Sequence, residues 1–241
     1  MKVNCPIILV GGSSSFEMAR KCLHCAEDHL DLRGEVPHAA VVTTASDDNP
    51  DIIAEISGYL DDLPCTYDII LTVRETPSAD ELCERLERAD VIYVPGGSEE
   101  RIRRVWSENG ADRALFDIAE RGNVLLVGSS AGAMAFSHAC PFVTPDGGTE
   151  IFRGWGLVPV WYTPHYQMEE YRLGFDGGLA AQSDPPLAFA SGDDAGVLRT
   201  PDGRFFTFFG GEGNPVWKYV FEDGEWRGTE FPQQPYDREI G

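Results

Sequence analysis

The sequence predicts an α/β protein with an open, mostly parallel, doubly wound sheet. In the first half of the chain, short apolar runs alternate with segments whose apolar residues recur at helical spacing. Runs such as residues 6–10, 91–94 and 124–127 are almost entirely apolar, which is typical of strands covered on both faces. A glycine follows each of these three runs within two residues. We therefore expect glycine turns at the carboxyl edge of the sheet, where open α/β sheets bind their ligands.

The elements of the parallel part follow one another through short connections. Strands are expected at residues 6–10, 39–43, 67–73, 91–94 and 124–127. Helices are expected at residues 16–30, 51–60, 79–88, 99–106 and 112–121, and a further helix follows Ser130 and includes His138. Serines at positions 13 to 15 and Ser78 can cap the first and third helices. Five strands that alternate with helices favour a parallel sheet with right-handed crossovers.

The chain changes character after His138. Residues 142–154 are rich in turn formers, residues 157–161 predict a strand, and residues 168–182 predict a helix interrupted by three glycines. Further short strands are expected at residues 187–190, 196–199, 205–209 and 217–221, with Asp-Gly turns at 202–203 and 223–224. No linker-like stretch divides the two parts, so we interpret these as antiparallel C-terminal strands added to the parallel sheet. Residues 1–241 are then a single domain.

Composition narrows the class of protein. The chain has 19 basic and 40 acidic residues and a net charge of −21, so neither nucleic acid nor an anionic membrane is an expected partner. No apolar run approaches the roughly 18 residues that span a bilayer, and no secretory signal is seen, which predicts a soluble, cytoplasmic protein. Six cysteines in a chain of this length favour buried thiols over disulfides, and the pair at Cys22 and Cys25 has no second pair with which to hold zinc.

A G-x-S-x-G turn interrupts the apolar stretch NVLLVGSSAGAMA at residues 123–135. The pattern predicts a strand, a sharp turn and a helix, with Ser130 at the strained centre of the turn. Its hydroxyl would stand at a helix N-terminus, where unpaired amides and the helix dipole favour negative charge. This position suits a nucleophile and its oxyanion, although the same turn could bind a phosphate or nothing at all.

A serine nucleophile needs a base within hydrogen-bond reach, and the chain has five histidines. His24, His29 and His38 lie in or near early helices and suit surface or core positions. His138 would lie about 12 Å from Ser130 along the same helix, which excludes it as the base. His165 follows a strand-like run and a proline, so it is expected at a strand end on the same rim as Ser130. A packing histidine between two aromatic residues is the alternative.

Three motifs occur in order along the chain. They are Val94-Pro95-Gly96-Gly97, then Gly128-Ser129-Ser130-Ala131-Gly132-Ala133, then Pro164-His165-Tyr166. Their order and spacing resemble the dipeptidase E and cyanophycinase family of serine peptidases, peptidase family S51, and the similarity runs over nearly the whole chain. The resemblance implies a class I glutamine amidotransferase-like (flavodoxin-like) fold and hydrolysis of small peptides through an acyl-enzyme. It implies no metal or organic cofactor, and a monomer or homodimer.

The resemblance also implies a role for each matching residue. Ser130 is the nucleophile, His165 the base, and the amides of Gly97 and Ala131 form the oxyanion hole. The family places a carboxylate, usually glutamate, in a late segment that resembles residues 191–196, where Asp193 is the first candidate. Asp194, Asp146 and Glu150 are the alternatives. An aspartate is one methylene shorter than glutamate, so Asp193 would need a closer backbone.

Substrate preference depends on residues outside these motifs. Ser98 stands where the family commonly has Asn or Asp, and Arg172 could hold the carboxylate of an N-terminal aspartate or pair with Glu169 on its own helix. The expected function is a serine exopeptidase or dipeptidase, with N-terminal aspartate as one candidate preference. An α/β-hydrolase esterase is disfavoured because too few residues follow Ser130. A binding or regulatory protein that has kept a glutamine-amidotransferase-like fold without the chemistry is the other alternative.

Overall fold

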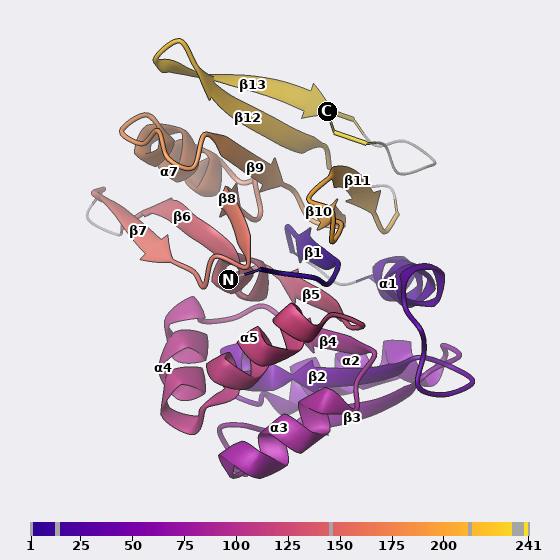
Figure 1. Ribbon diagram of the computed structural model, residues 1–241. Coiled ribbons are helices and arrows are strands. Elements are labelled where there is room, and N and C mark those ends of the chain that lie inside the picture. Colours follow the sequence, from indigo (N-terminus) through magenta and orange to yellow (C-terminus); the bar gives the residue numbers. More distant parts are fainter. Residues whose placement is uncertain (1, 13–14, 145–146, 212–213, 233–238, 241) are drawn as a thin grey trace.

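The computed structural model describes residues 2–12, 15–144, 147–211, 214–232 and 239–240, and two sheets organise it (Figure 1). The first sheet has the strand order β11-β10-β1-β5-β4-β2-β3. Its strands are β1 Ile7–Val10, β2 His38–Val42, β3 Thr66–Ile70, β4 Val91–Val94, β5 Leu125–Ser129, β10 Ala195–Arg199 and β11 Phe205–Phe209. The strands β1 to β5 are parallel, whereas β10 and β11 join antiparallel beside β1. The predicted fold class is therefore confirmed.

Helices cover both faces of the first sheet. They are α1 Phe16–His29, α2 Pro50–Asp61, α3 Ala79–Glu87, α4 Glu99–Asn109 and α5 Ala111–Arg121, and the short 3-10 helix η1 Thr43–Ser46 follows β2. Alternate side chains of β1 separate the two layers: Ile8 clusters with α1, whereas Ile7 clusters with side chains of α3, α4 and α5. Ser15 caps α1 by accepting the Met18 N–H, and Ser78 forms a capping box with Glu81 in α3, as the sequence predicted.

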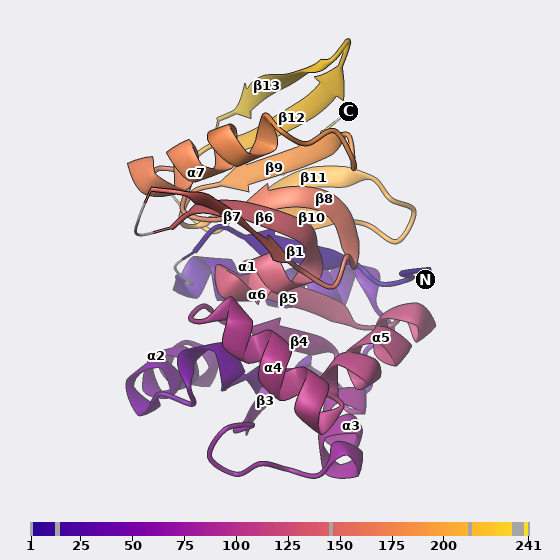
Figure 2. The same ribbon diagram turned by 90° about the vertical axis from the view of Figure 1, so that its left-hand side faces the viewer.

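The expectation that the C-terminal strands extend the parallel sheet holds only for β10 and β11, because the others form a second sheet of order β13-β12-β9-β8-β6-β7 in which β6 pairs with β8 and β8 with β9 in parallel. Its strands are β6 Ser137–Val143, β7 Thr149–Arg153, β8 Val158–Thr163, β9 Leu187–Ser191, β12 Val216–Glu222 and β13 Glu225–Phe231, and the helix α7 Glu169–Leu179 packs on it. The hairpin of β12 and β13 lies at the opposite end of the molecule from β3 and α3 (Figures 1 and 2). The largest hydrophobic cluster takes residues from both sheets, including Leu9, Tyr162 and Phe189. This shared core favours a single domain, which stays a prediction.

The helix predicted to run from Ser130 through His138 is wrong in its second half. The helix α6 spans only Ala131–Phe136, and His138 lies in β6. At Ser137 the backbone becomes extended, with φ −71° and ψ 174°, and its hydroxyl donates to the Met134 carbonyl. Amides of residues 154 to 156 then pair with the carbonyls of residues 135, 137 and 138. These tertiary hydrogen bonds override the helix propensity of the segment.

Two other expectations about the C-terminal half also need correction. Residues 142–154, interpreted as turns, contain the end of β6 and all of β7, which form a hairpin. The helix α7 runs without interruption through its glycines, because Gly174 and Gly178 pack against β6: a Cβ at Gly178 would lie 2.3 Å from the Pro141 Cβ. The Asp-Gly turns are present, with φ of 86° at both Gly203 and Gly224.

Candidate active site

The serine turn lies between β5 and α6. Ser130 has φ 51° and ψ −114°, a conformation that L residues rarely adopt, and its N–H donates to the Val10 carbonyl at 3.0 Å. The flanking glycines are required by close approach: a Cβ at Gly128 would lie 2.6 Å from the backbone of Gly132, and one at Gly132 would lie 2.1 Å from the Val94 oxygen. The turn is thus the strained strand-to-helix elbow that the sequence predicted.

His165 follows β8 and faces this turn. Its Nε2 lies 2.9 Å from the Ser130 Oγ. The backbone at His165 has φ 50°, and its N–H donates to the Gly11 carbonyl at 2.9 Å. The ring packs at an angle of 59° against Tyr171 of α7 with centroids 5.1 Å apart, and 21% of the His165 side chain is exposed. The base candidate is held by its backbone and by one aromatic neighbour.

Asp193 completes the chain of contacts from the loop between β9 and β10. Its Oδ1 lies 2.7 Å from the His165 Nδ1. The Asp193 N–H donates to the Gln167 side chain at 3.2 Å, and the Asn214 side chain donates to the Asp193 carbonyl at 3.3 Å. A carboxylate that accepts a hydrogen bond from the Nδ1–H leaves the Nε2 lone pair directed at the serine hydroxyl.

Glycines explain how an aspartate can reach the histidine. A Cβ at Gly12 would lie 2.1 Å from the His165 Cε1 and 2.4 Å from the Asp193 Oδ1. A Cβ at Gly11 would lie 2.2 Å from the Gly192 oxygen. Because residues 11 and 12 have no side chains, the backbone before Asp193 approaches the loop after β1 closely. This closer backbone compensates for the side chain of aspartate, which is one methylene shorter than that of glutamate.

Of the other acid candidates, neither Asp194 nor Glu150 hydrogen-bonds His165 among the described residues. Asp194 instead accepts the Ser15 N–H at 3.2 Å. Glu150 lies on β7 and is exposed, and Asp146 lies outside the described residues. His138 makes contacts of its own: its Nε2 lies 3.1 Å from an Arg153 nitrogen and its ring packs edge-on against Trp161. It is excluded as a partner of Ser130, although not by the helical spacing that the sequence suggested.

Two backbone amides lie beside the serine. Gly97 and Ala131 line a hollow together with Ser130, and neither N–H has a hydrogen-bond partner among the residues that the structure describes. Gly97 has φ 139°, and a Cβ there would lie 2.1 Å from the Ala45 oxygen, so only glycine fits. Ala131 is the first residue of α6, where helix amides are unpaired. Free amides next to a nucleophile suit an oxyanion.

Two hollows open on Ser130. The first, here the α4–α7 hollow, has a volume of about 390 Å³. It is lined by Gly97, Glu99, Ser130, Ala131, Met134, Phe142, Val143, Thr144, Glu170 and Tyr171. The second, the α2 hollow, has a volume of about 290 Å³ and is lined by His165, Ser129, Ser130, residues 95 to 97, Tyr93 and one face of α2. Substrate therefore has space on both sides of the serine.

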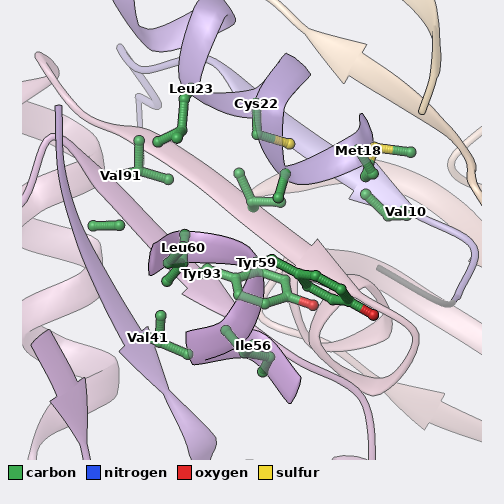
Figure 3. Close-up of a pocket in the computed structure, with 13 residues that line it drawn as sticks. Val10, Met18, Cys22, Leu23, Val41, Ile56, Tyr59, Leu60, Val91 and Tyr93 are labelled. Carbon is green, nitrogen blue, oxygen red and sulfur yellow. The ribbon is translucent and has the colours of Figure 1, made fainter. Parts of the chain in front are cut away.

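An apolar cavity of about 50 Å³ lies behind the α2 hollow (Figure 3). Side chains of α1, α2 and the sheet surround it, among them Met18, Leu23 and Leu60. Ile56, Tyr59 and Tyr93 line both this cavity and the α2 hollow. These three side chains form the wall between the apolar interior and the site.

The two residues predicted to bind substrate lie outside both hollows. Ser98 caps α4 by accepting the Arg101 N–H at 3.2 Å. Arg172 is exposed on α7, and its charge acts on Asp176, where it opposes the rise in pKa that burial causes at that carboxyl. Substrate contacts of Ser98 and Arg172 stay predictions.

Acidic side chains lie near Tyr171, on the side of the site that faces the α4–α7 hollow. Burial raises the pKa of Tyr171, and the nearby Glu170, Glu99 and Asp193 raise it further. No role in the site was expected for Tyr171, Glu99 or Glu170, because these residues lie at helix starts that carry no motif. The part of Gly12 in the site was not expected either, although the pair Gly11-Gly12 after a buried strand was a usable signal.

Comparisons of the sequence with known proteins show the family to which the chain belongs. Residues 7–187 match the sequence model of peptidase family S51. An uncharacterized peptidase, YgaJ, of Bacillus subtilis is 27% identical over 220 residues, which are 90% of this chain and 94% of that protein. Peptidase E of Escherichia coli is 27% identical over 149 residues, 58% of this chain and 62% of that protein.

Solved structures share the fold. A peptidase from an acI-B1 Actinobacterium superposes with a TM-score of 0.73 at 15% identity and covers 99% of this chain and 98% of its own. A putative Peptidase E from Listeria monocytogenes gives 0.57 at 17% identity and covers 80% of this chain and 93% of its own. The family match spans the first strand, the serine turn and His165, so the chain belongs to peptidase family S51.

Proposed function

We propose that this peptidase is a serine exopeptidase that hydrolyses dipeptides or other small peptides through an acyl-enzyme. The observation that carries the proposal is the chain of contacts from Ser130 through His165 to Asp193, with an Oγ to Nε2 distance of 2.9 Å and an Nδ1 to Oδ1 distance of 2.7 Å. Both distances are within hydrogen-bond reach for a nucleophile, its base and the group that orients the base.

In the acylation step, the Ser130 Oγ attacks the carbonyl carbon of the scissile bond and His165 Nε2 takes its proton. The negative charge that develops on the carbonyl oxygen is stabilised by the N–H groups of Gly97 and Ala131. His165 then gives the proton to the leaving nitrogen, the C–N bond breaks, and an ester to Ser130 remains. Asp193 keeps the imidazole in the productive tautomer and stabilises its charged form.

In the second step, water attacks the ester carbonyl and His165 accepts a proton from it. The tetrahedral intermediate uses the same two amides. His165 returns the proton to the Ser130 oxygen as the acyl product leaves, so the enzyme ends in its starting protonation state.

The exopeptidase part of the proposal is supported by the small size of the site. The α4–α7 hollow, at about 390 Å³, lies near the lower limit of ligand pockets, which span roughly 300–1,000 Å³. Its lining includes Glu99 of α4 and both Glu170 and Tyr171 of α7. A preference for N-terminal aspartate is not part of the proposal, because the described residues that line either hollow include no arginine or lysine.

The test compares the purified protein with a Ser130→Ala variant on a dipeptide panel that includes α-Asp-X, β-Asp-X and neutral N-termini. Release of free amino acid by the wild type alone, together with fluorophosphonate labelling of Ser130, supports the proposal. Absence of both cleavage and labelling would replace it with the binding-protein alternative, in which the fold is retained without hydrolysis.

A further inference from the structure

The α4–α7 hollow combines a nucleophile with unpaired carboxylates. Glu99 and Glu170 line it together with Ser130, and neither glutamate has an ion pair or a hydrogen bond to its side chain among the described residues. In the part of the chain that the structure describes, the lining of this hollow has no lysine, arginine or histidine. The described lining of this hollow therefore carries two negative charges and no positive side chain, whereas Arg103, Arg104 and Arg153 line a separate hollow that Glu99 also borders.

Helix stability alone does not account for these two carboxylates. Glu99 and Glu100 lie in the first turn of α4, and Glu169 and Glu170 in the first turn of α7, where acidic side chains favour the helix dipole. All four serve that purpose equally, but only Glu99 and Glu170 line the hollow. The other member of each pair thus provides a matched control.

The charges do not cancel within the hollow. Each helix N-terminus contributes roughly half a positive charge, whereas each ionised glutamate contributes a full negative one. The two helix starts together therefore offset only about half of the charge of the two glutamates. Glu170 and Glu99 both raise the pKa of Tyr171, whose ring lines the hollow and packs at a tilt against His165.

The position of His165 indicates which part of a substrate lies in this hollow. His165 has to protonate the leaving nitrogen, and it lines the α2 hollow but not the α4–α7 hollow. The leaving residue therefore extends into the α2 hollow, and the acyl residue into the α4–α7 hollow. In an exopeptidase that releases the N-terminal residue, the acyl residue carries the free α-ammonium group.

The apolar part of the lining suits a long side chain with a charged end. Met134, Phe142 and Val143 line the hollow beside the two glutamates, and Val143 is 40% exposed. Lysine and arginine pack their methylene stems on such surfaces while the charged group stays at the rim. An aspartate side chain would place a third carboxylate beside Glu99 and Glu170.

We propose that Glu99 and Glu170 select a basic N-terminal residue, lysine or arginine, through its α-ammonium and side-chain cations. This inference rests on the proposed function, because it names the substrate class of the same site. A net charge of −21 favours the approach of such substrates at low ionic strength.

The experiment measures kcat/KM for Lys-Leu, norleucine-Leu and Asp-Leu, since norleucine has the lysine stem without its ammonium group. We expect Lys-Leu to exceed norleucine-Leu by about tenfold, a ratio that falls as salt rises, and Asp-Leu to be the poorest of the three. Glu99→Gln and Glu170→Gln should each lower the Lys/norleucine ratio by about threefold. Glu100→Gln and Glu169→Gln should leave the ratio as it is in the wild type.

Binding separates this inference from the proposed function. Calorimetry with the Ser130→Ala variant reports the affinity for Lys-Leu and norleucine-Leu without turnover. If the wild type cleaves no peptide, the proposed function fails, and a tenfold preference for Lys-Leu in calorimetry still supports the cation site. Equal affinities, equal kcat/KM values, or control variants that lower the ratio as much as Glu99→Gln would overturn it.

Discussion

Gly12→Ala should inactivate the enzyme although residue 12 carries no functional group. The new Cβ would lie 2.1 Å from the His165 Cε1 and 2.4 Å from both its Nδ1 and the Asp193 Oδ1. Ordinary contacts begin near 3.4 Å, so the ring has to retreat by more than 1 Å. Cε1 is bonded to both ring nitrogens, and its displacement therefore disturbs the contact with Ser130 and the contact with Asp193 together.

The expected loss follows from the cost of misplacing a catalytic group. A shift of about 1 Å costs on the order of 100-fold, and loss of a triad member's function reaches about 10⁴-fold, so kcat/KM should fall by a factor between these values. Stability should change little, because Gly12 lacks a left-handed φ and the partly exposed His165 ring can turn outward. Activity, the rate of fluorophosphonate labelling and the melting temperature are measured on the same preparation.

Gly58→Ala is the matched control for this substitution. A Cβ at Gly58, in α2, meets nothing within 4 Å, so alanine should leave activity intact and stabilise the helix by about 0.5–1 kcal/mol. The reasoning is refuted if the Gly12→Ala enzyme keeps activity within tenfold of the wild type. It is also refuted if the Gly12→Ala enzyme loses activity only in proportion to a loss of folded protein.

The remaining predictions concern carboxylates. Asp193→Asn should lower kcat/KM by about 10⁴-fold, as expected for loss of the group that orients the base. Asp194→Asn should lower kcat/KM far less, because Asp194 hydrogen-bonds Ser15 instead. Steady-state kinetics on one dipeptide compares the two variants. Asp48 is fully buried and accepts hydrogen bonds from one hydroxyl and two backbone amides. Asp48→Ala should therefore lower the free energy of unfolding, measured in urea, by on the order of 3 kcal/mol. A decrease of less than about 1 kcal/mol would contradict this prediction. The Arg85 guanidinium hydrogen-bonds the Asp68 carboxylate and lowers the pKa of Asp68 below its ordinary value of 3.8. The pair therefore stabilises the fold above pH 3.8, and this contribution is lost as the pH falls through the pKa that Asp68 has in the folded state. Asp68→Asn should therefore show a weaker loss of stability between pH 5 and pH 2 than the wild type in urea titrations, and parallel profiles would speak against the pair.

The parallel part of the fold could be predicted because each strand carries its own signal. The runs at β1, β2, β4 and β5 are apolar on both faces, and glycines mark the ends of β1, β4 and β5. The serine turn was visible for the same reason, since G-x-S-x-G is a local pattern with a local cause. Boundaries differ by only a few residues, as at α1, which ends at His29 rather than at residue 30.

The segment after α6 could not be predicted in this way. Ala131 to Ala135 favour a helix, and nothing local marks its end at Phe136, since hydrogen bonds to residues 154 to 156 begin the strand. Pro141 was the one local signal against a longer helix, because a proline inside a helix removes a hydrogen bond. The close approach of Gly12 to His165 and Asp193 could not be predicted either, because it depends on three segments that are distant from one another in the sequence.

Three consecutive carbonyls after β1 set the geometry of the site. The carbonyls of Val10, Gly11 and Gly12 accept hydrogen bonds from the backbone N–H groups of Ser130, His165 and Asp194, respectively. Each of these three donors has a φ between 50° and 54°, so this segment holds three residues in a backbone conformation that L residues rarely adopt. The backbone spacing of residues 10 to 12 thus sets the separation between Ser130, His165 and the loop that carries Asp193. Because the sheet positions the backbone first, the distance between Asp193 and His165 depends on residues 10 to 12 as much as on the length of the Asp193 side chain.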